Sequence, residues 1–435
     1  MASVLLLLLM AFLDTFAVGL CGPVMPSVLR SNIVGANLFS ALSSVSNAAA
    51  LIAAVCIGRL SDVCGRKAAI LLSACTSVLG YMCYWPGLAN ADGDASHASV
   101  LLPCCGRVLT TAGRAALVAP MNALLGDMLG PDAAKAQLGK MMGAFGLGFA
   151  SGNGLGGYLA SAGLRWPLGV ATAVAIAKLV CAMLLPSITP SQRGRAGGGV
   201  VMWFASMRVA CAHSLTRLLL LLQLLASSSF HIFASTSSLY YRERLGYSSS
   251  QLGYLLSFAG WTFSFQTLIV VPWLVKRSSR ASSTLILAFV CTAIGRLGLA
   301  TSSWLAPTPT ILSSFVVLNL GQGLTSTLLK AFMGRIAPDG ERGLLLGLLS
   351  SCEKLAGVLA PLAGGPIYSF AGQAAPGLVS SCVALTGACL VLVLPSHTKS
   401  LDQATSATKS GLPEVPSTPQ LDPLSMAAHT RAKSD

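Results

Sequence analysis

The sequence predicts an all-α integral membrane protein with twelve transmembrane helices. Hydrophobic residues make up 54% of the chain and charged residues only 10%, and the mean hydropathy is +0.72. A soluble surface needs roughly 25% charged residues, so this chain cannot cover itself with charge in water. Its apolar runs are also far longer than barrel strands and lack their two-residue alternation. Both observations favour membrane-spanning helices.

Each apolar run is long enough to cross a hydrocarbon core of about 30 Å, which needs about 20 residues per helix. The predicted helices cover residues 2–28, 36–57, 67–89, 98–121, 137–160, 166–186, 215–240, 250–275, 281–302, 308–331, 343–370 and 374–395. The first run begins like a signal peptide, but it lacks a basic start and continues to about Val28. A membrane helix is therefore the favoured interpretation of that run.

The spacing of the runs predicts two halves. Residues 1–186 and 215–395 each hold six predicted helices, and 187–214 form a longer loop rich in Gly, Ser and basic residues. Residues 396–435 are polar and rich in Pro, Ser and Thr, which predicts a disordered tail. We expect two six-helix bundles joined by a cytoplasmic loop and followed by a cytoplasmic tail.

The distribution of positive charge predicts the orientation in the membrane. The formal net charge is +14, and the Lys and Arg residues fall in short clusters between the apolar runs. With both termini cytoplasmic, 18 lie in inner loops and the tail, 4 in outer loops and 6 inside helices. This bias follows the positive-inside rule. Because no basic stripe alternates with aromatic residues, a nucleic-acid partner is not expected.

One loop, Gly58–Lys67, carries an unusual set of residues between the second and third predicted helices. Its glycines allow a tight turn between helix ends, and an acidic side chain near the start of the third helix is favoured by the helix dipole. Basic side chains at the same interface can latch neighbouring helices in one state and release them in another. The expected gate residues are Gly58, Arg59, Asp62, Gly65, Arg66 and Lys67, with Asp127 as a further gate or cap residue.

The fifth predicted helix is dense in glycine. Gly148, Gly152, Gly156 and Gly157 surround Asn153, although each glycine costs a helix interior about 1 kcal/mol. Small residues four apart let membrane helices approach closely. Close packing and a role in coupling are the two interpretations of this motif.

Both motifs resemble those of the major facilitator superfamily. The Gly58–Lys67 segment is similar to the family's signature loop, with Ser61 and Val63 as departures, and the resemblance implies a role in the inward–outward switch. The glycines resemble the fifth-helix motif of antiporter branches, in which proline stands at the position of Asn153. Arg107 lies where the family has a fourth-helix arginine, although the residues after it differ. The chain looks closest to the drug-exporter, tetracycline-transporter-like orphan branch, which implies two six-helix halves with a site between them.

Charged residues inside predicted helices are functional candidates by default. The substrate or coupling candidates are Asp14, Arg107, Arg114, Glu353 and Lys354. Asp14 can bind a cationic solute, take up a proton or pair with either arginine. Glu353 and Lys354 are adjacent and point about 100° apart on a helix, so they need not pair with each other.

Three further polar residues have less specific expectations. Lys178 and Lys330 are expected to extend their amines toward the membrane interface. His231 is expected to be a satisfied core histidine, with cavity lining as the alternative.

The favoured function is a secondary active or facilitative transporter of a small organic solute, with proton coupling left open. The chain holds no nucleotide-binding loop, no catalytic triad and no metal-ligand spacing, so we expect no enzyme activity, cofactor or metal. The expected partners are the solute, protons and lipid, with a functional monomer. The alternative is a scaffold, chaperone or receptor that uses a transporter fold without transporting.

Overall fold

The structure of this chain is a computed structural model, which describes residues 2–29, 31–86, 97–129, 131–186, 214–278, 280–305, 307–336 and 342–393. Most of the predicted central loop, 187–214, and all of the predicted tail, 396–435, lie outside the described residues. Within the described ranges every regular element is a helix.

The described residues form twelve long helical segments. They are α1 (Ala2–Cys21) continued by η1 (Gly22–Val24) and α2 (Met25–Val28), α3 (Ser31–Cys64), α4 (Arg66–Met82), α6 (His97–Leu129), α7 (Pro131–Ser161), α8 (Arg165–Leu184), α10 (Ser214–Ala234) continued by α11 (Ser237–Leu239) and η3 (Tyr240–Arg244), α12 (Ser249–Phe265) continued by η4 (Gln266–Val270) and α13 (Val271–Arg277), α14 (Ala281–Thr301) continued by η5 (Ser302–Trp304), α15 (Pro307–Ile336), α16 (Arg342–Ala371) and α17 (Ala375–Val393). Ten of these segments are long and apolar enough to cross a membrane by length and composition alone. The two that do not meet this criterion are α4 and α7.

Several helices extend beyond the predicted apolar runs. α3 continues to Cys64, seven residues past the predicted end, and α6 continues to Leu129, eight residues past it. Hydropathy detects only the part of a helix that crosses lipid, whereas polar turns in water keep their backbone hydrogen bonds. The predicted helices were therefore correctly placed but too short at these ends.

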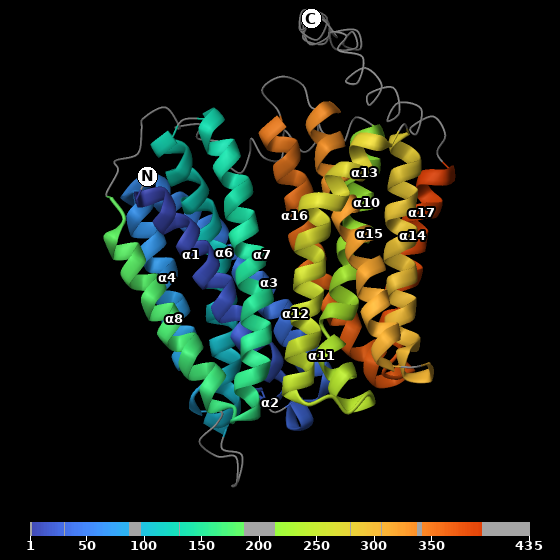
Figure 1. Cartoon of the computed structure of the whole chain (residues 1–435), viewed down its shortest axis with the longest axis horizontal. Coiled ribbons are helices and arrows are strands. Elements are labelled where there is room, and N and C mark those ends of the chain that lie inside the picture. Colours follow the sequence, from blue (N-terminus) through green and yellow to red (C-terminus); the bar gives the residue numbers. More distant parts are fainter. Residues whose placement is uncertain are drawn as a thin grey trace, which may run out of the picture.

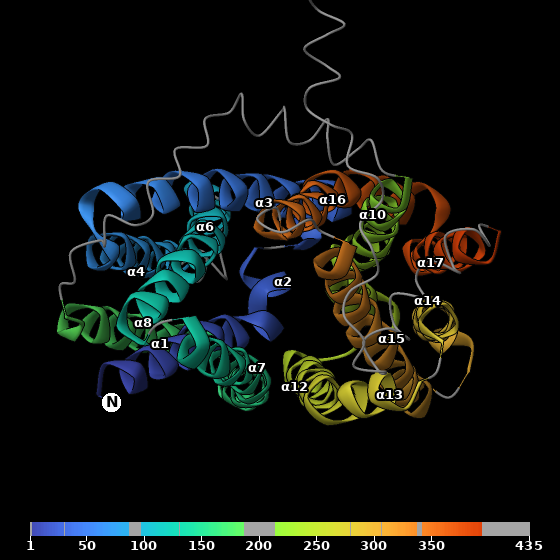
Figure 2. The ribbon, with the colours of Figure 1, turned by 90° about the horizontal axis from the view of Figure 1, so that it is seen from above.

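The helices gather in two bundles that stand side by side (Figure 1). One bundle contains α1, α3, α4, α6, α7 and α8, and the other contains α10, α12, α14, α15, α16 and α17. Seen from above, α3 lies beside α16 and α7 lies beside α12 (Figure 2). These two helix pairs form most of the interface between the bundles.

The two ends of the molecule can be named after the turns they carry. At the Gly65 end, α3 gives way to α4 through Gly65, whose φ of 94° is in the region that favours glycine. At the Gly163 end, α7 gives way to α8, and α12 begins with Ser248 as its N-cap. There the Ser248 hydroxyl accepts a hydrogen bond from the Gln251 amide, and the Gln251 side chain accepts one from the Ser248 amide.

Candidate functional site

The bundles are tied together at the Gly163 end by polar contacts. The Arg242 guanidinium donates a hydrogen bond of 2.7 Å to the Ser27 hydroxyl. The Ser369 hydroxyl donates one of 3.0 Å to the Asn37 side-chain oxygen. Both contacts join residues of different bundles, so they close this end of the interface.

Small residues bring α7 and α12 together along the same interface. A Cβ added to Gly157 would lie 2.8 Å from the Gly253 Cα, so the two backbones touch at this point. Further along α12, the Ser257 hydroxyl donates a hydrogen bond of 2.8 Å to the Ala150 carbonyl. The contact therefore covers the stretch of α7 that leads to the Gly163 end.

The other motif glycines of α7 face its own bundle. Added Cβ atoms at Gly148, Gly152 and Gly156 would collide with carbonyl oxygens of α1. Asn153 is fully buried between α1 and α12, and its side-chain amide donates to the Phe149 carbonyl at 2.8 Å. The motif thus serves close packing on two faces of one helix.

A cavity of about 370 Å³ lies between the bundles, mainly in the second one. Its wall combines aromatic rings, such as Phe230 and Phe263, with polar side chains, such as Gln223 and Asn47. Asn47 comes from α3 of the first bundle and donates a hydrogen bond of 2.7 Å to the Gly357 carbonyl of α16. The cavity therefore has contributions from both bundles, as a solute site at their interface requires.

Three charged side chains line this cavity: Lys330, Glu353 and Lys354. Among the described residues, none of them has an ion-pair partner. A second hollow of about 390 Å³ shares Lys330 and Glu353 and continues along α16 toward its start. Because α16 starts at the Gly65 end, the hollow space extends toward that end.

His231 also lines the cavity, which corrects the expectation of a satisfied core histidine. Its ring contacts Phe230 edge to face, with the ring centroids 5.0 Å apart. Lys330 lines the cavity as well, and the expected extension of its amine toward the membrane interface stays a prediction.

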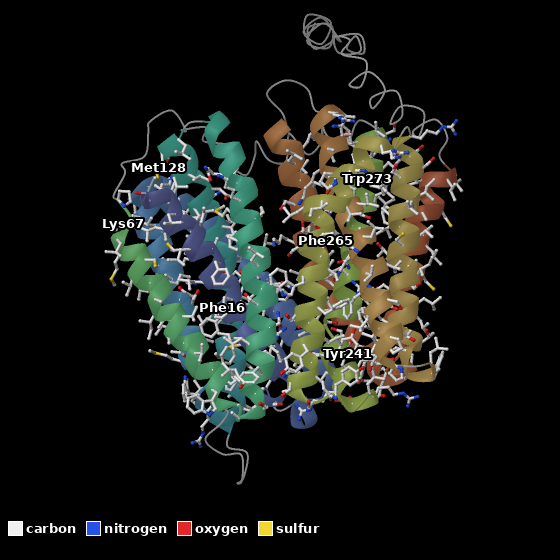
Figure 3. All side chains as sticks on the ribbon, viewed as in Figure 1. Phe16, Lys67, Met128, Tyr241, Phe265 and Trp273 are labelled. Carbon is white, nitrogen blue, oxygen red and sulfur yellow. The ribbon has the colours of Figure 1, made fainter. Side chains whose placement is uncertain are left out.

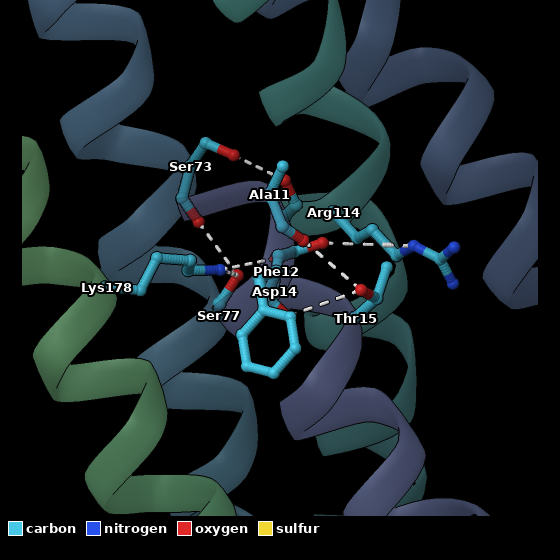
Figure 4. Close-up of polar contacts among 9 residues, drawn as sticks. Ala11, Phe12, Asp14, Thr15, Ser73, Ser77, Arg114 and Lys178 are labelled. Atoms are coloured by element: carbon cyan, nitrogen blue, oxygen red, sulfur yellow. Dashed lines mark hydrogen bonds and ion pairs between the residues drawn. The ribbon is translucent and has the colours of Figure 1, made fainter. Parts of the chain in front are cut away.

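Asp14 is the centre of a buried ion cluster in the first bundle (Figure 4). The Lys178 amine lies 2.6 Å from one Asp14 carboxylate oxygen and donates a second hydrogen bond, of 2.9 Å, to the Ser77 hydroxyl. Asp14 and Lys178 are only 3% and 2% exposed. The Arg114 Nε lies 3.9 Å from the other carboxylate oxygen and is half-exposed. Asp14 is thus paired, closely with Lys178 and loosely with Arg114.

The expected interface position of Lys178 was therefore wrong. Lys178 lies 13 residues into the predicted helix 166–186, and its buried amine pairs with Asp14 of another helix instead of reaching the surface. Its place in the middle of an apolar run was the sequence signal that could have identified it.

Arg107 does not belong to the Asp14 cluster. Its guanidinium lies 5.5 Å from the centre of the Phe39 ring and donates a hydrogen bond of 3.3 Å to the Ser43 hydroxyl. Both partners come from α3, so Arg107 links α6 to the helix that meets α16.

The gate cluster, defined as Asp62, Arg66 and Asp127, lies at the Gly65 end. The Arg66 guanidinium pairs with Asp62 and, at 3.1 Å, with Asp127 of α6, and it donates to the Ser61 hydroxyl at 3.0 Å. The structure thus brings three of the expected gate residues together. Figure 3 shows neighbouring Lys67 at this end of the molecule.

The expected helix-start position of Asp62 was wrong, because α3 continues to Cys64 and Asp62 lies in its last turn. There the helix dipole disfavours an anion, and Arg66 supplies the compensating charge. Gly58 and the exposed Arg59 lie within α3 as well. Gly65 alone forms the turn.

Arg296 of α14 is a buried cation to which the sequence pattern assigned no role. It is 3% exposed, and its guanidinium lies 5.1 Å from the centre of the Phe233 ring and 5.6 Å from that of Phe230. Its Nε and one Nη have no hydrogen-bond partner among the described residues. An arginine inside a predicted membrane helix was the available signal.

Known proteins resemble this chain along most of its length. The family model described as Major Facilitator Superfamily matches residues 7–280 and 219–427. The class B tetracycline resistance protein of Escherichia coli is 24% identical over 379 residues, covering 85% of this chain and 89% of that protein. The class H protein of Pasteurella multocida is 23% identical and covers 91% of this chain and 96% of that protein. The crystal structure of the nucleoside transporter NupG matches the fold with a TM-score of 0.72 at 12% identity, covering 92% of this chain and 100% of that one.

Proposed function

Because the chain belongs to the Major Facilitator Superfamily, and is therefore a multi-pass membrane transporter rather than an enzyme, we propose that it moves a small organic solute by alternating access. In this mechanism one solute site between two helical bundles opens to each side of the membrane in turn. The energy comes from a gradient of the solute or of protons.

The observation that carries this proposal is the asymmetry between the two ends of the interface. The hydrogen bonds between Arg242 and Ser27 and between Ser369 and Asn37 join the bundles at the Gly163 end. The hollow space instead extends toward the Gly65 end. A site closed on one side and continuous with the other is one of the two states that alternating access requires.

The charge distribution of the chain supports a cytoplasmic Gly65 end. In the topology predicted from the sequence, 18 of the loop and tail cations fall on the side that carries Gly65 and 4 on the other side. With this orientation both termini are cytoplasmic, and the structure corresponds to the inward-facing state. The two bundles would act as the domains that rock, with 187–214 as the link between them.

The gate cluster supports a conformational switch at the same end. Asp62 and Arg66 flank the α3–α4 turn, and Asp127 comes from α6 of the same bundle. In the opposite state the second bundle approaches this end, so contacts of the cluster change between states. A difference in contacts between two states is what sets their populations.

The Asp14 cluster supports a place for coupling. Asp14 contacts α8 through Lys178 and α6 through Arg114, so its charge helps to hold three helices together. Protonation of Asp14 would release Lys178 and loosen this contact. We therefore assign proton coupling to Asp14. Of the other candidates, Arg107 contacts α3, and Glu353 and Lys354 line the cavity.

A disulfide across the closed end tests alternating access. Asn37→Cys combined with Ser369→Cys places thiols where the native side chains are 3.0 Å apart. Purified protein in liposomes is tested for uptake from a metabolite panel at two pH values. Oxidation should abolish uptake by the double variant, reductant should restore it, and neither single variant should respond.

Uptake that persists in fully cross-linked protein would contradict alternating access. No movement of any solute in the panel by the native chain would instead favour a scaffold or receptor role. The comparison of the two pH values reports on protons separately: uptake by Asp14→Asn that no longer depends on pH supports the coupling assignment, and unchanged pH dependence contradicts it.

A further inference from the structure

The cavity of about 370 Å³ described above has an excess of positively charged side chains in its wall. Lys330 and Lys354 line it with a single acidic residue, Glu353, and the described structure gives none of the three an ion-pair partner. An unpaired charge at membrane depth is unfavourable unless water or a ligand surrounds it. The cavity therefore offers an anion at least one uncompensated cation.

Arg296 adds a third cation behind the cavity wall. Its guanidinium faces the ring of Phe230, which lines the cavity, and its Nε and one Nη lack acceptors within the described part of the chain. His231, also in the wall, packs edge to face against Phe230, the ring that Arg296 faces. The three cations thus all come from the second bundle, on α14, α15 and α16.

Among the residues that the structure describes, the first bundle contributes no acidic side chain to the cavity wall. Asp14, its buried acid, is neutralised by Lys178 and approached by Arg114. Asn47, which this bundle contributes to the cavity, is uncharged. The remaining wall holds the rings of Phe230, Phe263 and Phe289 beside uncharged Gln, Ser and Thr side chains, so an apolar body attached to the charged group finds aromatic surface there.

We infer that the solute is a small organic anion whose acidic group binds at Lys354 and whose apolar part lies against Phe230 and Phe263. This inference rests on the proposed transport function and names the chemical class of its solute. The cavity volume of about 370 Å³ fits this size, because ligand sites typically span about 300–1,000 Å³. Glu353 opposes the anion and limits its affinity, so the site can release what it binds.

The test compares probes that share a ring system and differ in charge. Indole-3-acetate, indole-3-acetamide and tryptamine form one such triplet, and a set of aromatic and aliphatic monocarboxylates is examined with matched amides and amines. Binding is measured on the full-length protein in lipid nanodiscs. At least one acid should bind about tenfold or more tightly than its amide and amine, since a hydrogen bond to a charged group contributes more than a neutral one.

Charge variants assign the preference to residues. Lys354→Gln should reduce binding of the acid to that of its amide and leave the amide unchanged, whereas Glu353→Gln should strengthen binding of the acid. Arg296→Lys should keep the preference that Arg296→Gln weakens. Lys276→Gln is the matched control, because Lys276 is an exposed cation of α13 outside the cavity.

The inference is overturned if no acid in the set is preferred, if the amines bind best, or if Lys354→Gln weakens acid and amide alike. Its failure is distinguishable from failure of the proposed function. Uptake of a neutral or cationic solute without anion binding would remove the inference alone. Anion binding without uptake would remove the transport proposal alone.

Discussion

Lys178→Met should destabilise the folded protein by about 3 kcal/mol. The substitution keeps the apolar stem but leaves Asp14 without the amine 2.6 Å away. At an effective dielectric constant of about 20, that attraction amounts to about 6 kcal/mol. Removing one partner of a buried ion pair typically costs about 3–5 kcal/mol after relaxation. Arg114, 3.9 Å from the other carboxylate oxygen, stays in place, so we expect the lower end of that range.

The assay is reversible unfolding in mixed micelles by increasing dodecyl sulfate, followed by the fluorescence of the six tryptophans. The double variant Asp14→Asn/Lys178→Met removes both charges and should recover most of the loss. A buried ion pair replaced as a unit is often nearly neutral. The double-mutant cycle should therefore give a coupling free energy of about 2–3 kcal/mol.

Lys140→Met is the matched control, because Lys140 is an exposed lysine of α7. Surface substitutions of this kind usually change stability by less than about 0.5 kcal/mol. If the losses of the Asp14 and Lys178 single variants simply add in the double variant, the two groups do not interact energetically. That result would refute the reasoning from their distance and burial.

Three further predictions concern the two ends of the interface. Gly157→Leu should prevent the contact with Gly253, open the Gly163 end in most molecules and lower uptake; spin-label distances across that end should lengthen, and unchanged distances would contradict the packing argument. Arg242→Gln should weaken the hydrogen bond to Ser27 and open the Gly163 end in fewer molecules than Gly157→Leu does. A loss of about 1 kcal/mol raises the population of the open state only several-fold, so a change in spin-label distances as large as that of Gly157→Leu would be inconsistent with this. Asp127→Asn removes one of the two carboxylates of the gate cluster and should slow uptake with little change in solute binding, whereas equal losses in both would place Asp127 at the solute site.

Sequence reasoning placed the helices well because lipid imposes a minimum apolar length on each one. The ends of the helices were harder to predict, since polar turns such as the last turn of α3 leave no hydropathy signal. Asp62 was consequently assigned to the start of the wrong helix. Cap chemistry and helix dipoles can be applied only after the boundary is known.

The partners of buried charges were harder to predict than their existence. Asp14 was identified as an intramembrane acid, but Lys178 is 164 residues away in the sequence. Which of several intramembrane cations meets Asp14 depends on how each helix is rotated about its axis. Arg107 and Arg114 share α6, yet only Arg114 approaches the carboxylate.

The two glycine faces of α7 imply that substitutions on this helix would harm the protein in two different ways. Gly152 contacts α1 within one bundle, so a larger residue there disturbs a contact that every molecule needs in order to fold. Gly157 contacts Gly253 across the interface, where the proposed alternating access requires the bundles to separate. Substitutions at Gly152 would therefore lower the amount of protein in the membrane. Substitutions at Gly157, five residues away on the same helix, would leave a normal amount of protein that transports poorly.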